Sequence, residues 1–202
     1  MMADLDQHHQ QAFELLTSPR VRDAFDIETE DDVTRRSYGM HTFGQSALVA
    51  RRLVERGVTF VTVNCEPWDH HGSANRYQTE EGSKLLIPPL DHAIAGLVTD
   101  LENRGLYDDT MIIAMGEFGR TPRMNKYAGR DHWGRTFSVL VGCGGMNMGQ
   151  VVGRSNARGE HVVSRPISPE DVAATVYRHL GINGEKTMFN DRLGRPMPLI
   201  AN

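Results

Sequence analysis

The spacing of apolar residues along the chain predicts five helices. Over residues 43–54 and 79–104, apolar side chains recur every three or four positions, which places them on one face of a helix. Pro88-Pro89 is expected to kink the second of these helices or to split it. Ser168-Pro169, followed by two acidic residues, is a typical helix start. Helices are therefore expected at residues 6–16, 19–25, 43–54, 79–104 and 169–180, with residues 1–40 forming a helical, surface-exposed segment.

Short apolar runs predict strands between these helices. Residues 58–64 (VTFVTVN) and 110–115 (TMIIAM) have the β-branched, nearly continuous apolar character of strands that are buried on both faces. The helix between them makes a βαβ unit, so the two strands should run parallel. Residues 137–143 and 150–153 are expected to add a third strand and a short fourth. We therefore expect one α/β domain over residues 1–202, with a mostly parallel sheet flanked by helices.

Two polar clusters follow the first two predicted strands. Trp68-Asp69-His70-His71-Gly72 comes just after the first strand, and Glu117 with Phe118-Gly119-Arg120 comes just after the second. Functional crevices of open α/β sheets lie at the carboxyl ends of the strands, so both clusters are expected at one edge.

A third cluster, Gly129-Arg130-Asp131-His132-Trp133-Gly134, precedes the strand predicted at residues 137–143. The link from Glu117 shows no helical period, so an antiparallel return would bring His132 back to the same edge. Asp69, His71, Glu117 and His132 would then form a mixed oxygen and nitrogen ligand set suited to Zn²⁺, Mn²⁺ or Fe²⁺. Histidine ligands argue against Ca²⁺ and Mg²⁺. Taken singly, each residue also has an ordinary explanation as a turn former, a surface histidine or a backbone cap.

Arginines flank this candidate metal site. Guanidinium groups bind phosphate or sulfate oxygens in a bidentate manner, so Arg120 and Arg130, together with His70, are candidate residues for an anionic ester substrate. The alternative is that the arginines pair with nearby acids such as Asp131. Cys65 and Cys143 are interpreted as small buried thiols. The chain has no Walker loop, GxGxxG, GxSxG, HExxH or paired CxxC motif.

Charge and hydropathy exclude some classes of partner. A net charge of −4 and a pI near 6.1 give no electrostatic reason to expect nucleic acid or an anionic membrane. No apolar run approaches the roughly 20 residues that cross a bilayer, so no membrane span is expected. The polar, acidic start is not a signal peptide, and as written the chain would stay in the cytoplasm.

Several strings give the chain a resemblance to a known family. They are YGMHTFGQSALVARRLVERGVTFVTVN, WDHHG, KLLIPPLDHAIAGLVTDLENRGLYDDT, MGEFGRTPRMN and GRDHWGRTFSVLVGCGG. With these strings the chain resembles the bacterial DUF1501 family, which is placed in the alkaline phosphatase/sulfatase-like superfamily. The similarity runs from about Leu5 to the segment DRLGRPMP at residues 191–198.

The resemblance implies an alkaline-phosphatase-like core with a two-metal crevice and hydrolysis of phosphate or sulfate esters. Asp69 and His71 look like the Asp/His pair that follows one core strand, and His132 resembles the late histidine ligand. Glu117-Phe118 stands where many relatives have an Asp-His pair, and this departure leaves the second metal position in question.

Family members are usually about twice as long as this chain. Their N-terminal half carries the first core strand, the nucleophile and further acidic ligands. The chain therefore looks like the C-terminal half of a longer protein, with a core that is incomplete on the N-terminal side. Full-length relatives often begin with a twin-arginine export signal, which would place the parent protein outside the cytoplasm.

Three functions follow from these expectations. The first is a metal-dependent ester hydrolase or a fragment of one, and the second is a metal-binding module without turnover. The third is a non-catalytic binding or structural protein whose exposed sheet edge pairs with another chain. Because the nucleophile is missing, we expect this chain to bind Zn²⁺ or Mn²⁺ with weak or absent turnover.

Overall fold

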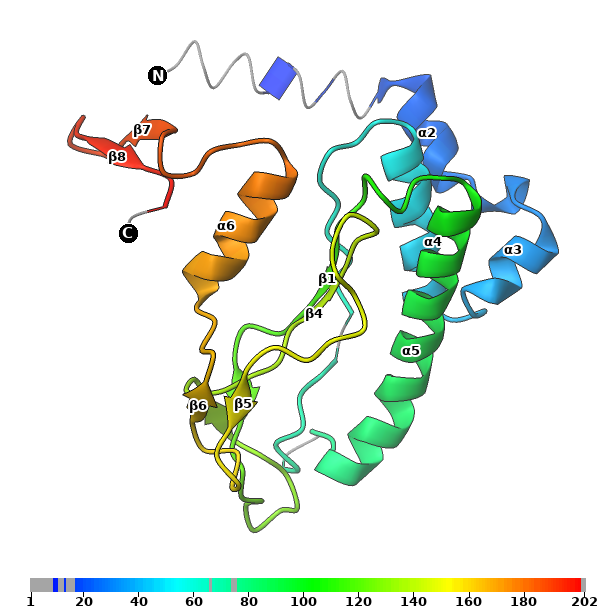
Figure 1. Cartoon of the computed structure of the whole chain (residues 1–202). Coiled ribbons are helices and arrows are strands. Elements are labelled where there is room, and N and C mark those ends of the chain that lie inside the picture. The colour runs from blue at the N-terminus through cyan, green and yellow to red at the C-terminus, as the bar shows by residue number, and fades with distance from the viewer. Residues whose placement is uncertain (1–8, 11–12, 14–16, 66, 74–75, 201–202) are drawn as a thin grey trace. The chain divides into compact units, whose positions relative to one another are not determined.

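The computed structural model describes residues 9–10, 13, 17–65, 67–73 and 76–200 (Figure 1). The chain divides into two compact units. The first comprises Met1–Asp108 with Asn125–Gly129, and the second comprises Asp109–Met124 with Arg130–Asn202. The sequence predicts a single α/β domain over residues 1–202, and the division into two units does not test that prediction.

The first unit is helical. Its described elements are α2 (Pro19–Phe25), the 3-10 turn η1 (Ile27–Thr29), α3 (Asp32–Ser37), α4 (Thr42–Glu55) and α5 (Thr79–Asn103). The helices predicted at residues 19–25 and 43–54 are confirmed as α2 and α4. The helix predicted at residues 6–16 falls largely outside the described residues.

Helix α5 is continuous through Pro88 and Pro89, so the proline pair does not split it. A proline inside a helix removes one N–H donor and crowds the carbonyl four residues earlier. The carbonyls concerned belong to Lys84 and Leu85, which lie on the exposed side of α5. Solvent can therefore replace the lost donors. Gly105, with φ of +68°, follows the end of the helix and adopts the left-handed conformation common there.

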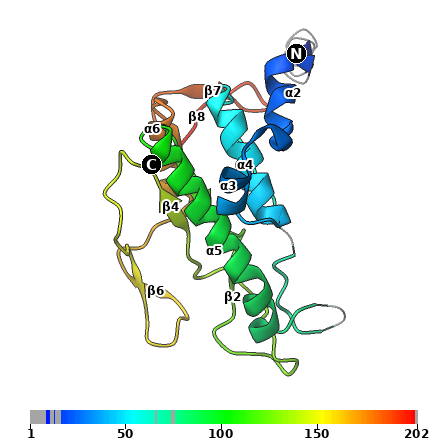
Figure 2. The same ribbon diagram turned by 90° about the vertical axis from the view of Figure 1, so that its right-hand side faces the viewer.

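Helices α4 and α5 lie side by side and enclose the core of the first unit (Figures 1 and 2). The buried core residues are Tyr38, Phe43, Ala47, Leu48, Leu86 and Ala93. Cys65, Trp68 and Tyr77, from the loop between the two helices, pack against this core. The core therefore supports the loop that carries Asp69 and His71.

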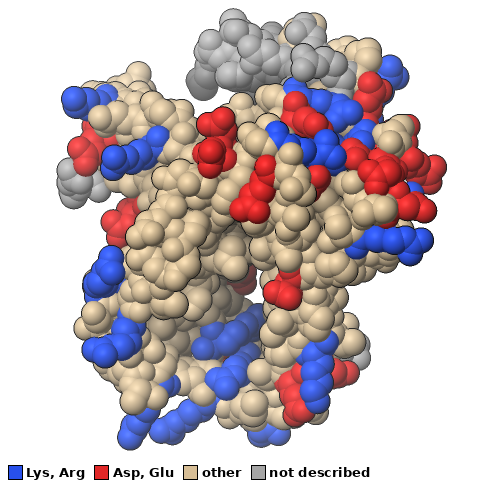
Figure 3. Space-filling model, turned by 45° about the vertical axis from the view of Figure 1, so that its right-hand side comes forward, with Lys and Arg blue, Asp and Glu red and all other residues tan. Residues whose placement is uncertain are grey.

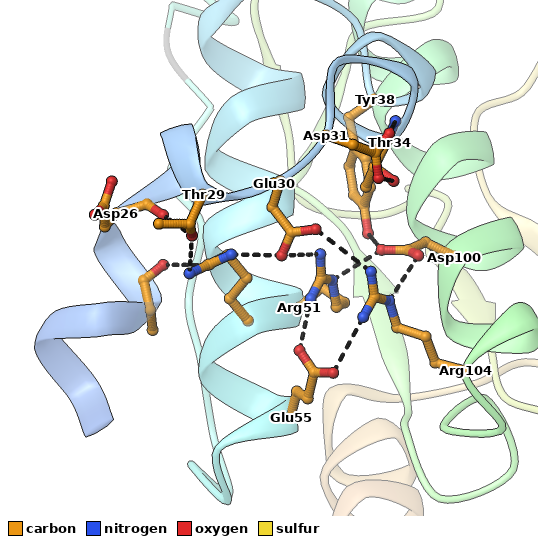
Figure 4. Close-up of polar contacts among 12 residues, drawn as sticks. Asp26, Thr29, Glu30, Asp31, Thr34, Tyr38, Arg51, Glu55, Asp100 and Arg104 are labelled. Carbon is orange, nitrogen blue, oxygen red and sulfur yellow. Dashed lines mark hydrogen bonds and ion pairs between the residues drawn. The ribbon is translucent and has the colours of Figure 1, made fainter. Parts of the chain in front are cut away.

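A buried network of ion pairs joins the helices of the first unit (Figure 4). The Arg51 side chain is fully buried and lies 2.6 to 2.8 Å from carboxylate oxygens of Glu30, Glu55 and Asp100. Arg104 contacts the same three carboxylates. A buried charge is costly unless it is paired, and here each guanidinium faces opposite charges.

Two further side chains complete the network. Arg52 pairs with Glu30 and donates to the carbonyl oxygen of Ala24, which fastens α4 to α2. The Tyr38 hydroxyl donates to Asp100 at 2.8 Å. Burial raises the pKa of Tyr38, and the hydrogen bond to Asp100 raises it further. Tyr38 therefore stays protonated as a donor.

The second unit contains short antiparallel hairpins. The strand β1 (Ile112–Ala114) pairs with β4 (Leu140–Gly142), and β2 (Gly119–Arg120) pairs with β3 (His132–Trp133). The strand β5 (Arg154–Ser155) pairs with β6 (Val162–Ser164), and β7 (Met188–Asn190) pairs with β8 (Pro196–Pro198). The remaining helix is α6 (Pro169–His179), and its predicted start is confirmed by a capping box between Ser168 and Asp171.

The described strands do not form the parallel sheet expected from the sequence. Residues 110–115 and 137–143 contain the strands β1 and β4, which pair antiparallel, as expected for a return strand after a link without a crossover helix. Residues 58–64 belong to no strand within the described chain, so the parallel partner expected for residues 110–115 is not among the described strands. Residues 150–153 likewise form no strand, and β5 begins at Arg154. A mostly parallel, alkaline-phosphatase-like sheet stays a prediction.

Of the helices that the structure describes, none has both the length and the apolar character needed to span a membrane.

Candidate functional site

The predicted ligands Asp69 and His71 contact each other in the first unit. The Nδ1 atom of His71 forms a close hydrogen bond with Oδ1 of Asp69. The second oxygen of Asp69, Oδ2, lies 3.1 Å from the Arg76 guanidinium. About a quarter of each side chain is exposed, at 26% for His71 and 27% for Asp69. Both carboxylate oxygens of Asp69 are therefore engaged, one by imidazole and one by arginine.

The backbone of His71 is held by the segment Asn125–Gly129. The Asn125 side-chain amide donates to the His71 carbonyl oxygen at 3.1 Å. The Asn125 side-chain oxygen accepts from the backbone of Tyr127 and Gly129, which folds the segment into a tight turn. The Thr79 N–H, at the start of α5, donates to the Ala128 carbonyl.

Glycines allow the two segments to approach closely. A Cβ atom at Gly129 would lie 2.1 Å from the His71 carbonyl group, and one at Gly72 would lie 2.3 Å from the Tyr127 carbonyl oxygen. Neither position therefore has room for a side chain. The loop that carries Asp69 and His71 is fixed by backbone packing on one side and by the helical core on the other.

His70 packs against the start of α5. Its Nε2 atom lies where a Cβ atom of Gly82 would stand, so the imidazole packs on the first turn of α5. Its ring lies 6.0 Å from that of Trp68. The prediction that His70 binds substrate is untested, but this packing gives His70 a structural role in seating the loop.

A cavity of about 140 Å³ lies beside Asp69 and is lined by Pro67, Asp69, Arg76 and Tyr77. It could admit a few waters or a small ligand group. Burial raises the pKa of the nearby Cys65 thiol. Cys65 is therefore protonated near neutral pH and is a poor nucleophile or metal ligand there.

The predicted ligands of the second unit lie on a hairpin. Arg120 of β2 is the register partner of His132 of β3, so the antiparallel return predicted for this loop is present. The His132 ring packs against that of Phe118, with 4.2 Å between centroids. Glu117, which precedes Phe118, is exposed, as is His132. The hairpin therefore brings the segment that begins at Glu117 next to His132.

The two arginines proposed to bind substrate also lie at this hairpin. Arg130 donates to the carbonyl oxygens of Thr121 and Pro122, both at 2.6 Å. Arg120 donates to the Arg130 carbonyl oxygen and lies 5.9 Å from the centre of the Phe118 ring. Arg130 therefore closes the loop of the hairpin. Anion binding by its other guanidinium N–H groups stays a prediction.

The four predicted metal ligands are divided between the units, with Asp69 and His71 in the first and Glu117 and His132 in the second. Among the residues that the structure describes, no three His, Cys, Asp or Glu side chains form a group that could hold a metal ion. Each pair is therefore characterised within its own unit, and their joint role as ligands stays a prediction.

Comparison with known protein families gives a match over residues 2–201 to a family described as a protein of unknown function, DUF1501. The chain belongs to the DUF1501 family. No curated protein matches it, and no solved structure does. The resemblance seen in the sequence is confirmed at the level of the family.

Two residues of this DUF1501 chain were missed in the sequence analysis. Arg76 neutralises Asp69, and Asn125 holds the backbone of His71. Asn125 ends the string MGEFGRTPRMN that carries the family resemblance, so its position in that motif was a usable signal. Arg76 lies outside the quoted strings and gave none.

Proposed function

We propose that this DUF1501 chain binds a divalent metal, Zn²⁺ or Mn²⁺, with His71 as a ligand and Asp69 as the residue that orients it. The observation that carries the proposal is the pair formed by Asp69 Oδ1 and His71 Nδ1. In metal sites, a ligating histidine usually donates its second ring N–H to a carboxylate, which fixes the tautomer and the ring orientation. Donation from Nδ1 to Asp69 leaves the ring lone pair on Nε2, the atom that would coordinate the metal.

The role of Asp69 is thereby refined. Sequence reasoning placed it among the ligands, but Arg76 occupies its second oxygen. A carboxylate that is neutralised by arginine and already bonded to imidazole is better suited to hold a ligand than to be one. Glu117 and His132 stay the ligands predicted for the second unit, and mixed imidazole and carboxylate ligands suit Zn²⁺ and Mn²⁺.

We further propose that the reaction class is hydrolysis of phosphate or sulfate esters, as in the alkaline phosphatase/sulfatase-like superfamily. A bound divalent cation would polarise the ester oxygens and lower the pKa of the attacking group. Arg120 supports the proposal as a cation placed beside His132 on the hairpin. On this proposal the chain corresponds to the C-terminal half of an alkaline-phosphatase-like core, so the chain alone should show weak or absent turnover.

Calorimetric titration of the chelator-treated chain with Zn²⁺ and Mn²⁺ tests the metal. Loss of an orienting carboxylate typically weakens metal binding about 10- to 100-fold, which is the expected effect of Asp69→Asn. His71→Ala should weaken binding at least as much, and His132→Ala tests the second unit. His161→Ala removes an exposed histidine outside the predicted ligands and is the matched control. Equal affinity in wild type, Asp69→Asn and His71→Ala would contradict the proposal.

Turnover is measured separately, with nitrophenyl phosphate and nitrophenyl sulfate and with or without added metal. The expected result is little or no hydrolysis by this chain. Robust hydrolysis would show that the nucleophile lies within residues 1–202 and would contradict that part of the proposal.

A non-catalytic role in pairing with another chain is the second candidate, and one observation favours it. Residues 58–64 have strand composition but belong to no strand within the described chain, and Phe60 is 70% exposed there. A segment of this composition could pair with a strand of another chain. Sedimentation over a range of concentrations tests it: Phe60→Lys should abolish any self-association, and a monomer at every concentration would remove the case for a second copy of this chain as partner.

A further inference from the structure

The two units carry opposite net charge. The first contains eleven Lys and Arg against eighteen Asp and Glu, whereas the second contains eleven Lys and Arg against eight Asp and Glu. Within the second unit, α6 and the residues that follow it are balanced at four of each sign. The positive excess therefore lies in the part of the second unit that precedes α6, which includes the hairpins β2–β3 and β5–β6.

Four arginines of this region form what we term the hairpin arginines: Arg135, Arg154, Arg158 and Arg165. All four are exposed. In the described part of the chain, the ion pairs of the second unit involve Arg195 and none of the hairpin arginines. Figure 3 shows blue side chains without adjacent red ones in the lower left of the view. Such unpaired surface arginines are available to a ligand.

Contacts between the hairpins keep these arginines in one neighbourhood. The Trp133 indole N–H donates to the Glu160 carbonyl oxygen at 3.0 Å, which ties β3 to the turn between β5 and β6. Arg135 lies 5.6 Å from the centre of the Trp133 ring. Arg154 is the register partner of Ser164, which precedes Arg165. The hairpin arginines therefore belong to one hairpin and to the strand end attached to it.

The backbone at Arg165 is a second feature of this region. Its backbone φ of +46° is in the left-handed region, which residues other than glycine, asparagine and aspartate rarely adopt. Gly153 lies opposite, where a Cβ atom would be 3.1 Å from the Arg165 carbonyl oxygen. The end of the hairpin is thus held in a costly conformation that presents an exposed arginine.

The number of these charges suits a chain of anions better than one anion. Arg154 lies in β5, Arg158 in the turn that follows β5, and Arg165 just after β6. One phosphate or sulfate group is neutralised by one or two guanidinium groups, which leaves the other hairpin arginines without a counter-charge. A linear polymer with an anionic group on successive units can pair with several of them.

The composition of the region favours a polysaccharide over a single-stranded nucleic acid. Single-stranded nucleic acids are bound largely by stacking on aromatic rings. Residues 138–165, which hold three of the four hairpin arginines, contain no Phe, Tyr or Trp.

We propose that the hairpin arginines bind a linear polysaccharide that bears sulfate or phosphate ester groups. The proposal rests on the proposed function only in taking this polymer as the substrate class. The binding itself is a matter of arginine and oxyanion charge and does not require the metal.

Fluorescence anisotropy with labelled dextran sulfate tests the proposal on the chelator-treated chain. Arg154→Gln/Arg158→Gln should weaken binding about tenfold or more and should lower the slope of log affinity against log salt by about two. Lys186→Gln/Arg192→Gln removes the same charge from the balanced region after α6 and should leave the affinity within about twofold of wild type. Circular dichroism of all variants confirms that they are folded.

Three results would overturn the proposal. They are equal affinity of the two double variants, binding of uncharged dextran or of carboxylated polygalacturonate as tight as that of dextran sulfate, and tighter binding of single-stranded or duplex DNA. Asp69→Asn is included because it should leave dextran sulfate binding unchanged. In Asp69→Asn, loss of metal binding with intact polymer binding is the result that both proposals expect. Failure of the wild-type chain to bind dextran sulfate, with metal binding intact, would reject only this proposal.

Discussion

Arg51 in the first unit of this DUF1501 chain and the hairpin arginines in the second differ in burial and in ion pairing. Arg51 of the first unit is completely buried and contacts three carboxylates, whereas Arg154 and Arg158 of the second unit are exposed and unpaired within the described residues. A buried guanidinium must be neutralised by fixed partners or the fold is destabilised. An exposed one contributes little to the fold. The difference indicates that Arg51 serves the stability of the first unit, and it agrees with the proposal that the hairpin arginines bind a ligand.

Removal of Arg51 should have the largest effect. Arg51→Met leaves the carboxylates of Glu30, Glu55 and Asp100 facing one another, and their remaining cations are Arg52, Arg56 and Arg104. Breaking a buried ion pair typically costs about 3–5 kcal/mol, and urea unfolding should show a loss of that order. Arg36→Met, at an exposed position of α3, is the matched control and should change stability by less than about 0.5 kcal/mol. Similar losses in both variants would contradict the structural role of Arg51.

Removal of the Tyr38 hydroxyl should have a smaller effect. Tyr38→Phe keeps the ring in the core but deletes the donor to Asp100. A hydrogen bond to a charged group is worth about 1.5–3 kcal/mol, and the partial exposure of Asp100 favours the lower end. A double-mutant cycle with Asp100→Asn should recover this coupling. Additive effects of the two substitutions would show that the hydroxyl and the carboxylate do not interact in solution.

Acid should weaken the same network more gradually. Burial raises the pKa of Glu30, but Arg51 and Arg52 lower it more, so that the pKa of Glu30 lies below its ordinary value of 4.5. A carboxyl with a depressed pKa adds stability that is present above the unfolded-state pKa and lost as the pH falls through the folded-state pKa. Stability should therefore decline below about pH 4.5, and Glu30→Gln should flatten that decline. If stability declined equally at low pH in wild type and Glu30→Gln, the pairing of Glu30 with Arg51 and Arg52 would be contradicted.

The smallest effect on stability is expected in the second unit. Arg154→Gln/Arg158→Gln changes exposed side chains without ion pairs among the described residues, so the free energy of unfolding should shift by less than about 0.5 kcal/mol. The same variant is expected to lose polyanion binding. A loss of stability above about 1 kcal/mol would show that these arginines support the fold and would remove the contrast between the units.

Local signals in the sequence predicted the helices well. Ser168 and Pro169 defined the start of α6, and the apolar periodicity defined α4 and α5, because caps and helical faces depend on residues three or four apart. Strand pairing depends on partners far along the chain, and the apolar run at residues 58–64 could not show whether a neighbouring strand exists. The parallel sheet was therefore inferred from order alone.

The candidate site was predicted in part for the same reason. Asp69 and His71 are two residues apart, so their contact is local, and His132 was placed by the absence of a helix after Glu117. Asn125 reaches His71 across 54 residues, and Tyr38 reaches Asp100 across 62. No periodicity reports such contacts. The net charge of −4 also concealed the positive excess of the second unit, because a sum over the chain cancels charges that lie apart.

The most direct test of the central claim, that His71 coordinates a divalent metal while Asp69 holds its ring, is X-ray absorption spectroscopy at the zinc edge of the metal-loaded chain. The account predicts scattering from imidazole with a Zn–N distance of about 2.0–2.1 Å, reduced in His71→Ala and unchanged in His161→Ala. A shell of oxygen atoms alone, or the same imidazole scattering in wild type and His71→Ala, would contradict it.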